Sequence, residues 1–182
     1  LIGSARTVGA FRNDGTAQSP NWSFLSREFL AIPAGEAGCF PDFCDIDGDG
    51  DSDAFVSTWV GEVFFFRNDE SGFALVTNRF VNLGDYSTTI EFADLDADGD
   101  FDLLAGVCNG HGSSGGTAGT VLYFRNDGTP SSPQMTPLGN VLGLSVQPLD
   151  WVQVETLDMD GDGDLDVLMH GHSVYMGSGY SL

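Results

Sequence analysis

Three short runs of aspartate constrain this chain more than any other feature. Residues 45–53, 94–102 and 158–166 each carry aspartate at positions 1, 3, 5, 7 and 9, with glycine at position 6. These runs hold 15 of the 27 acidic residues. Five carboxylates within nine residues repel one another unless a cation lies among them. Because the same spacing occurs three times, it predicts three cation sites and not ordinary acidic turns.

The residue types in these loops favour Ca²⁺ over other metals. Calcium takes about six to eight oxygen ligands with flexible geometry, which a glycine-bent loop of carboxylates can supply. Softer metals prefer His or Cys, and neither occurs inside the loops. The candidate metal ligands are the fifteen loop aspartates Asp45, Asp47, Asp49, Asp51, Asp53, Asp94, Asp96, Asp98, Asp100, Asp102, Asp158, Asp160, Asp162, Asp164 and Asp166.

The three loops lack one ligand that an EF-hand loop requires. The EF-hand loop also opens with Asp-x-Asp-x-Asp-Gly, but it requires a bidentate Glu at position 12 and a helix on each side. Position 12 is Val56, Ala105 or Met169 here, and dockerin-type loops fail for the same reason. The residues after each loop are short, β-prone stretches bounded by glycine. We therefore expect a nine-residue loop that its own ninth residue closes and that joins two strands.

A second motif recurs in phase with the loops. The tetrapeptide Phe-Arg-Asn-Asp occurs at 11–14, 66–69 and 124–127, each time after a β-prone stretch. The two motifs together repeat every ~50–60 residues, a period typical of propeller blades or repeat arrays. We expect the arginine of each motif to pair with a neighbouring carboxylate or carbonyl; these arginines are Arg12, Arg67 and Arg125.

Each period has room for four short strands. Alternating and aromatic-rich segments separated by turn signals are typical of a blade made of an antiparallel sheet. In the second repeat the expected strands are 88–93, 102–107, 120–126 and 134–139, with the aspartate loop between the first two.

Taken together, these motifs resemble FG-GAP/VCBS repeats, the calcium-binding blades of integrin-α-like β-propellers, over nearly the whole chain. The resemblance implies an all-β fold, a β-propeller-type array of four-stranded antiparallel blades with a Ca²⁺ loop between the first two strands of each. It also implies that loop positions 1, 3, 5 and 9 give side-chain carboxylates. Position 7 then gives a backbone carbonyl, and the matching residues are Asp51, Asp100 and Asp164.

The repeats divide the chain into one region with unequal parts. Closed propellers have at least about four blades, and residues 173–179 depart from the Phe-Arg-Asn-Asp pattern. We therefore expect a segment of a longer protein, with edge-paired assembly of several copies as the main rival. The expected parts of the single region 1–182 are the tail of a preceding blade and a connection (1–39), two blades (40–87 and 88–150) and a partial blade (151–182).

These features predict an interaction module and not an enzyme. Three structural Ca²⁺ ions in an extracellular or cell-surface protein would serve adhesion, recognition or structural assembly. The alternatives are a lectin-like carbohydrate binder, a self-assembling subunit of an extracellular filament, and a non-catalytic module of a larger secreted enzyme. The expected partners are a protein or glycan ligand, or further copies paired through open blade edges. A net charge of −21 argues against nucleic acid, and no apolar run approaches a membrane span.

The cysteines and one sequon bear on the compartment. In an oxidising compartment we expect a Cys39–Cys44 disulfide with Cys108 left as a buried thiol, or else Cys108 paired with one of those two. The spacing does not fit a zinc site. The triplet that begins at Asn21 is an N-glycosylation sequon, which weakly favours secretion.

The remaining candidates have simpler interpretations. Trp22, Trp59 and Trp151 are expected to be core or blade-packing aromatics, with sugar stacking by one exposed tryptophan as the alternative. The histidines have no ligand or catalytic spacing and are expected to be structural or surface residues; they are His111, His170 and His172.

Overall fold

The structure, a computed structural model, is all-β with antiparallel sheets. It describes residues 7–33, 38, 40–84, 86–108, 119–129, 132–140, 143 and 151–172. These residues form strands and turns and contain no helix. Within the described ranges, nothing helical therefore has the length and apolar character needed to cross a bilayer.

The strands form two complete sheets and two hairpins. The sheets are β3-β4-β5-β6 and β7-β8-β9-β10, each an antiparallel meander in chain order, and the hairpins are β1–β2 and β11–β12. The strands are β1 Thr7–Asn13, β2 Trp22–Ala31, β3 Phe40–Cys44, β4 Asp53–Ser57, β5 Val63–Asp69, β6 Gly72–Thr77, β7 Tyr86–Ala93, β8 Asp102–Cys108, β9 Thr120–Asn126, β10 Met135–Gly139, β11 Trp151–Leu157 and β12 Asp166–His172.

The strand pattern expected for the second repeat is confirmed within two residues at every boundary. The four strands β7, β8, β9 and β10 occupy the predicted segments and pair in the predicted order. Each aspartate loop joins the first two strands of its sheet or hairpin. The four-stranded units of the sequence analysis are therefore real sheets, and the periodicity locates them correctly.

The second strand of each sheet is buried on both faces. All five residues of β4 are buried, so both faces of this strand are covered. Alternate side chains point to opposite faces, so Ala54 and Val56 contribute to one hydrophobic cluster and Phe55 to another. Leu104 of β8 likewise faces away from Leu103.

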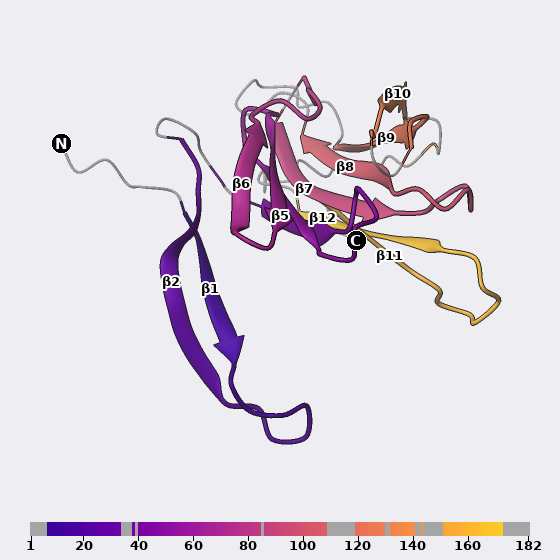
Figure 1. The fold of residues 1–182 in the computed structure, drawn as a ribbon. Helices are drawn as coiled ribbons and strands as arrows, with labels where there is room; N and C mark the ends of the chain where they lie inside the picture. Colours follow the sequence, from indigo (N-terminus) through magenta and orange to yellow (C-terminus); the bar gives the residue numbers. More distant parts are fainter. Residues whose placement is uncertain are drawn as a thin grey trace, which may run out of the picture.

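Three apolar clusters pack successive sheets and hairpins against one another; Figure 1 shows the strands that contribute to them. The largest lies between the two four-stranded sheets and contains Phe55, Phe65, Phe92, Leu103 and Phe124. A second cluster joins Leu30 and Ile32, at and just after the end of β2, to β4 and β5. A third cluster joins β8 and β9 to Val152 and Val154 of β11. Each of the two four-stranded sheets thus packs against the unit before it on one face and against the unit after it on the other.

The centre of the largest cluster is aromatic. The ring centroid of Phe55 lies 4.3 Å from that of Phe92, 4.9 Å from that of Phe80, and 4.8 Å from that of Phe65, which it stacks. Such pairs contribute beyond the area they bury. Because Phe92 lies on β7, its contact with Phe55 joins the second sheet to the aromatic group of the first.

The hairpin β1–β2 projects from the stacked sheets (Figure 1). Its far end exposes Phe11, Trp22 and Phe24, and Trp22 is 65% exposed. The expectation of a core position for Trp22 is wrong, because the described residues supply no second sheet over this end of the hairpin. Trp59 is also exposed in part and lies over Gly38, whose added Cβ would approach its ring to 2.5 Å.

The cysteine expectation is also corrected. Cys44 is a free, buried thiol at the end of β3, so neither disulfide that would use it is formed. Burial in the apolar cluster raises the pKa of this thiol, and the carboxylates of Asp42 and Asp53 add to the effect. Such a thiol is unreactive. Cys39, His111 and residues 173–179 lie outside the described residues, as do the side chains of Cys108, Trp151 and His172.

We expect the substitution Phe55→Ala to destabilise the protein by about 3–5 kcal/mol, because it leaves a cavity where three aromatic rings converge. The matched control Leu75→Ala removes a side chain that is largely exposed on β6 and should cost less than about 1 kcal/mol. Urea unfolding at fixed ionic conditions measures both. Equal losses would contradict the central position of Phe55.

Candidate metal centres

Each aspartate loop is held by the carboxylate of its own first residue. In the first loop, Asp45 accepts hydrogen bonds from the backbone amides of Asp49 (3.0 Å) and Gly50 (2.9 Å). Such side-chain bonds to the backbone two to five residues later are the means by which aspartate stabilises turns. The same two bonds recur in the other loops, from Asp98 and Gly99 to Asp94 (3.1 Å each) and from Asp162 and Gly163 to Asp158 (3.2 and 3.1 Å).

The backbone at positions 4 and 6 of the loops is left-handed. Position 6 has φ between +94° and +97° in all three loops, which favours the glycine found there. Position 4 is Gly48 and Gly161 in the first and third loops but Ala97 in the second, where φ is +59°. Ala97 is the non-glycine residue with positive φ among the described residues, and it stores strain in the second loop.

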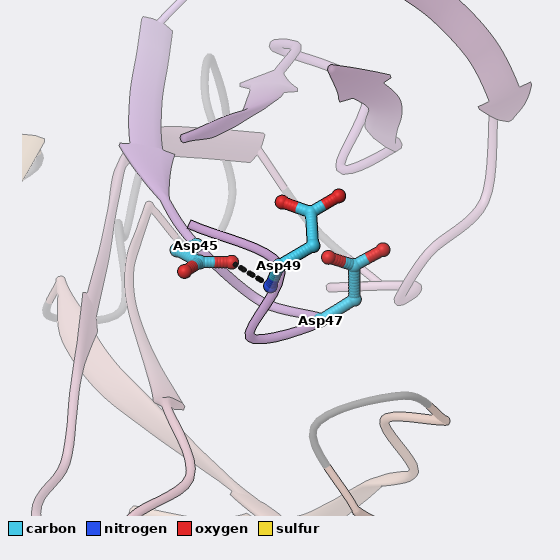
Figure 2. A group of neighbouring side chains, drawn as sticks. All are labelled: Asp45, Asp47 and Asp49. Atoms are coloured by element: carbon cyan, nitrogen blue, oxygen red, sulfur yellow. Dashed lines mark hydrogen bonds between the residues drawn. The ribbon is translucent and has the colours of Figure 1, made fainter. Parts of the chain in front are cut away.

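The carboxylates at positions 1, 3 and 5 converge in every loop, and Figure 2 shows this group in the first loop. Each contributes one oxygen to a group whose members all lie within 4.8 Å of one another. Oxygens bound to one Ca²⁺ at about 2.3–2.6 Å can be separated by at most ~5 Å, so these groups have the dimensions of a calcium site. The three groups are Asp45, Asp47 and Asp49; Asp94, Asp96 and Asp98; and Asp158, Asp160 and Asp162.

Two buried oxygens in the first loop lack a hydrogen-bond partner in the described part of the chain. They are Oδ1 of Asp47 and Oδ2 of Asp53. A buried carboxylate oxygen without a donor is costly, and a bound cation would offset that cost; Asp47 belongs to the group of converging oxygens, whereas Asp53 lies outside it. Burial raises the pKa of Asp53 to about 6; the charges of Asp47 and Asp49 add to the rise, while the amide of Asn68 opposes it. These residues therefore fit a bound cation.

The ninth aspartate connects the loop to the third strand of the sheet. The backbone amide of Asn68 on β5 donates to Oδ1 of Asp53 at 2.7 Å. In the next sheet, the amide of Asn126 on β9 donates to Oδ1 of Asp102 at 2.8 Å. Both asparagines belong to the Phe-Arg-Asn-Asp motif, so the two recurring motifs of the sequence meet at this hydrogen bond.

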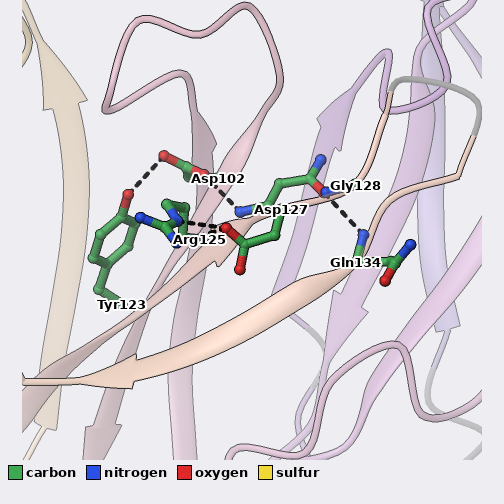
Figure 3. Close-up of polar contacts among 7 residues, drawn as sticks. Asp102, Tyr123, Arg125, Asp127, Gly128 and Gln134 are labelled. Carbon is green, nitrogen blue, oxygen red and sulfur yellow. Dashed lines mark hydrogen bonds and ion pairs between the residues drawn. The ribbon is translucent and has the colours of Figure 1, made fainter.

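Tyr123 adds a contact that the sequence analysis missed. Its hydroxyl donates to Oδ2 of Asp102 at 2.9 Å (Figure 3). The amide of Leu95 approaches the same oxygen at 3.3 Å. Burial raises the pKa of Asp102, while the bonds from Asn126 and Tyr123 counteract that rise. The tyrosine precedes the Phe-Arg-Asn-Asp motif directly, but the position holds Phe65 in the first sheet, so the sequence offers no recurring signal for it.

The third loop has an exposed ninth aspartate. Oδ2 of Asp166 accepts from the amide of Met159 at 3.0 Å, but the described residues place no third strand beside β12. Asp166 is thus exposed to solvent, whereas Asp53 and Asp102 are completely buried. The position-7 side chains, Asp51, Asp100 and Asp164, lie outside all three groups of converging carboxylates.

The motif arginines pair with carboxylates, as expected. Arg67 Nε lies 3.0 Å from Oδ2 of Asp47, which links the third strand to loop position 3. Arg12 and Arg125 pair instead with the aspartate two residues later, Asp14 and Asp127, at 2.6 Å each (Figure 3). Most of these groups are exposed in large part, so the pairs orient side chains and contribute little stability.

We expect Ala97→Gly to stabilise the protein by up to about 1 kcal/mol, because it relieves a left-handed alanine at a modest cost in chain entropy. The reverse change at position 6 of the first loop, Gly50→Ala, should destabilise the protein by about 1 kcal/mol or more, because the φ of +97° at Gly50 disfavours a side chain. Urea midpoints at a fixed calcium concentration test both. A loss on Ala97→Gly would refute the strain at this position.

Comparison with known proteins identifies one repeat. A family model described as an FG-GAP-like repeat matches residues 45–105, from the start of the first aspartate loop to the strand after the second. No curated protein and no solved structure matches the chain significantly. The resemblance inferred from the motifs is thereby confirmed for this segment, in which residues 45–105 match the FG-GAP-like repeat model.

Proposed function

We propose that the three aspartate loops each bind one Ca²⁺ ion and that the ions are structural. The observation that carries the proposal is the convergence of three carboxylate oxygens within 4.8 Å in every loop. The buried, partnerless oxygens of Asp47 and Asp53 support it in the first loop. Positions 1, 3, 5 and 9 would supply side-chain oxygens, and position 7 a backbone carbonyl.

The ion would stabilise the folded state by offsetting charge repulsion. Each loop crowds five carboxylates, and the ninth is buried in two of the loops. The raised pKa of Asp53 means that its ionisation at neutral pH costs folding free energy. A divalent cation removes that cost and fixes the loop that sets the first strand against the second. Calcium binding is then coupled to sheet stability.

The stacked sheets further support a role as a β-propeller-type interaction module. Sheets packed face to face in chain order would present their loops along one side of the array. In this proposal the module is extracellular or at a cell surface, serves adhesion, recognition or structural assembly, and performs no catalysis. A screen of the calcium-loaded protein against a glycan array separates lectin-like recognition from the other interaction roles.

Removal of calcium should lower the melting temperature. A ligand at about 100 times its dissociation constant stabilises the folded state by ~2.7 kcal/mol per site. For a chain of this length that corresponds to roughly 5–10 °C per site. Differential scanning calorimetry with excess Ca²⁺ and with EDTA measures the shift, and Mg²⁺ serves as the ion control. An unchanged melting temperature would refute a structural role for the ion.

Single-loop variants should each remove one ion. Asp47→Asn, Asp96→Asn and Asp160→Asn change the position-3 ligand of one loop each, and calorimetric titration should then give two tight sites in place of three. The control Asp69→Asn removes the same charge from an exposed residue outside the loops, which bonds to Ser71. It should leave three sites. A stoichiometry that does not respond to the loop variants would exclude these loops as the sites.

A further inference from the structure

The hairpin β1–β2 has the geometry of the last two strands of a sheet. In β5–β6 and β9–β10 the register shifts directly before the motif phenylalanine, and β1–β2 has the same shift between Ala10 and Phe11. Oδ1 of Asn13 accepts from the amides of Gly15 (2.9 Å) and Asn21 (2.8 Å). Asn126 makes the same pair of bonds in the second sheet. β1 is therefore a third strand whose first and second strands are not in this chain's described part.

The hairpin β11–β12 is the opposite half. It carries the aspartate loop between its strands, as the first two strands of both sheets do. Its β12 pairs only with β11 in the described residues. In the two sheets, the backbone amide that donates to the ninth aspartate, Asp53 or Asp102, belongs to the third strand. Asp166 has no third strand beside it among the described residues. Among the described residues, β1–β2 thus corresponds to the second half of a four-stranded sheet and β11–β12 to the first half.

The outer face of β11–β12 is an exposed copy of a face that is buried elsewhere. Two residues after the ninth aspartate come Phe55, Leu104 and Leu168; the first two are completely buried, while Leu168 is 50% exposed. One residue before the loop, Cys44 and Ala93 are buried but Leu157 is exposed. A hollow of about 150 Å³ lies on this hairpin, lined by Gln153, Val154, Glu155, Leu168 and His170.

The first sheet exposes the matching inner face. Ile90 and Phe92 of β7 are buried against the sheet before them. The equivalent residues of β3, four and two positions before the loop, are Pro41 and Phe43, and both are exposed. The hairpin β1–β2 covers the other strands of this face through Leu30 and Ile32. The part of this face that stays uncovered, around Pro41 and Phe43, is the part that the first and second strands of a preceding sheet would cover.

A carboxylate three residues before the first and second loops bonds to the next sheet or hairpin in the chain. Asp42 Oδ2 accepts from the amide of Phe92 at 2.9 Å. Glu91 Oε1 accepts from the amide and hydroxyl of Thr156 at 3.2 and 2.9 Å. Glu155 is the third member of this series and is exposed. The amide equivalent to those of Phe92 and Thr156 belongs to Phe43, which donates to its neighbour Asp42 at 2.8 Å.

From this complementarity we propose that copies of the chain associate head to tail, with β11–β12 of one copy and β1–β2 of the next forming one four-stranded sheet. The occupant of each open end is the opposite end of a second copy, because β1–β2 would supply a third and a fourth strand, and β11–β12 would supply a first and a second strand together with the carboxylate of Glu155. The interface repeats the two inter-sheet interfaces already present within the chain. The inference goes beyond calcium binding and does not depend on it.

The pairing has a defined register. The residue after the ninth aspartate pairs with the motif phenylalanine in both sheets, Ala54 with Phe66 and Leu103 with Phe124. Val167 would therefore pair with Phe11 of the second copy. The amide of Asn13 would then reach Asp166, and the exposed Arg12 would lie near loop position 3, as Arg67 does. Leu168 and Glu155 would meet Phe43 across the sheets.

Analytical ultracentrifugation of the purified chain in calcium-containing buffer, over a concentration series, tests the proposal. We expect association that increases with concentration. Leu168→Arg and Phe43→Arg should each raise the dissociation constant at least ~30-fold, because each buries a charge at the centre of the interface. The control Val60→Arg changes an exposed residue in the turn between β4 and β5 and should leave association unchanged. Circular dichroism establishes that each variant is folded.

A mixture of the two variants distinguishes head-to-tail pairing from other interfaces. Each variant retains one intact end, so an equimolar mixture should form dimers and nothing larger. A mixture that stays monomeric, although the parent chain associates, would overturn the proposal. So would association that survives Leu168→Arg, or a parent chain that stays monomeric over the whole concentration range.

Discussion

A single hydrogen bond ties the chemistry of this chain to its architecture. The ninth aspartate of a loop, completely buried as Asp53 or Asp102, accepts the backbone amide of the asparagine that ends the third strand. Burying a carboxylate is unfavourable unless donors or a cation compensate it. The loop, the third strand and the turn after it must therefore form together, because each supplies part of the environment that the buried carboxylate requires.

Much of the fold is predictable because its signals are local and recur. The aspartate spacing and the Phe-Arg-Asn-Asp motif each lie within a few residues, and together they locate the strands of the second repeat within two residues. The clustering of positions 1, 3 and 5 follows in the same way. The backbone amides of positions 5 and 6 donate to the carboxylate of the first aspartate and so bend the loop within its own sequence. The loop conformation therefore needs no contact from a distant part of the chain.

Contacts between sheets could not be predicted, because they depend on residues far apart in the chain. An acid precedes every loop by three positions, but only the stacking shows that Asp42 reaches Phe92, fifty residues away. Trp22 illustrates the converse. An aromatic residue next to a strand is usually core, yet no sheet among the described residues covers that end of β1–β2. The free thiol of Cys44 follows from its position on a face that packs against β7 and β8.

Stacked sheets of this kind behave as a one-dimensional array, in which each unit gains stability from its neighbours on both sides. An interior residue such as Phe55 or Leu104 is completely buried by the next unit, whereas Leu168 at the same position of the last unit is half exposed. Full burial of one such side chain is worth about 1.5–3 kcal/mol. A terminal unit therefore lacks this contribution, together with the inter-sheet bond that Glu155 has the position to make. The repetition that buries Phe55 and Leu104 therefore leaves the equivalent residue of β12, Leu168, half exposed among the described residues.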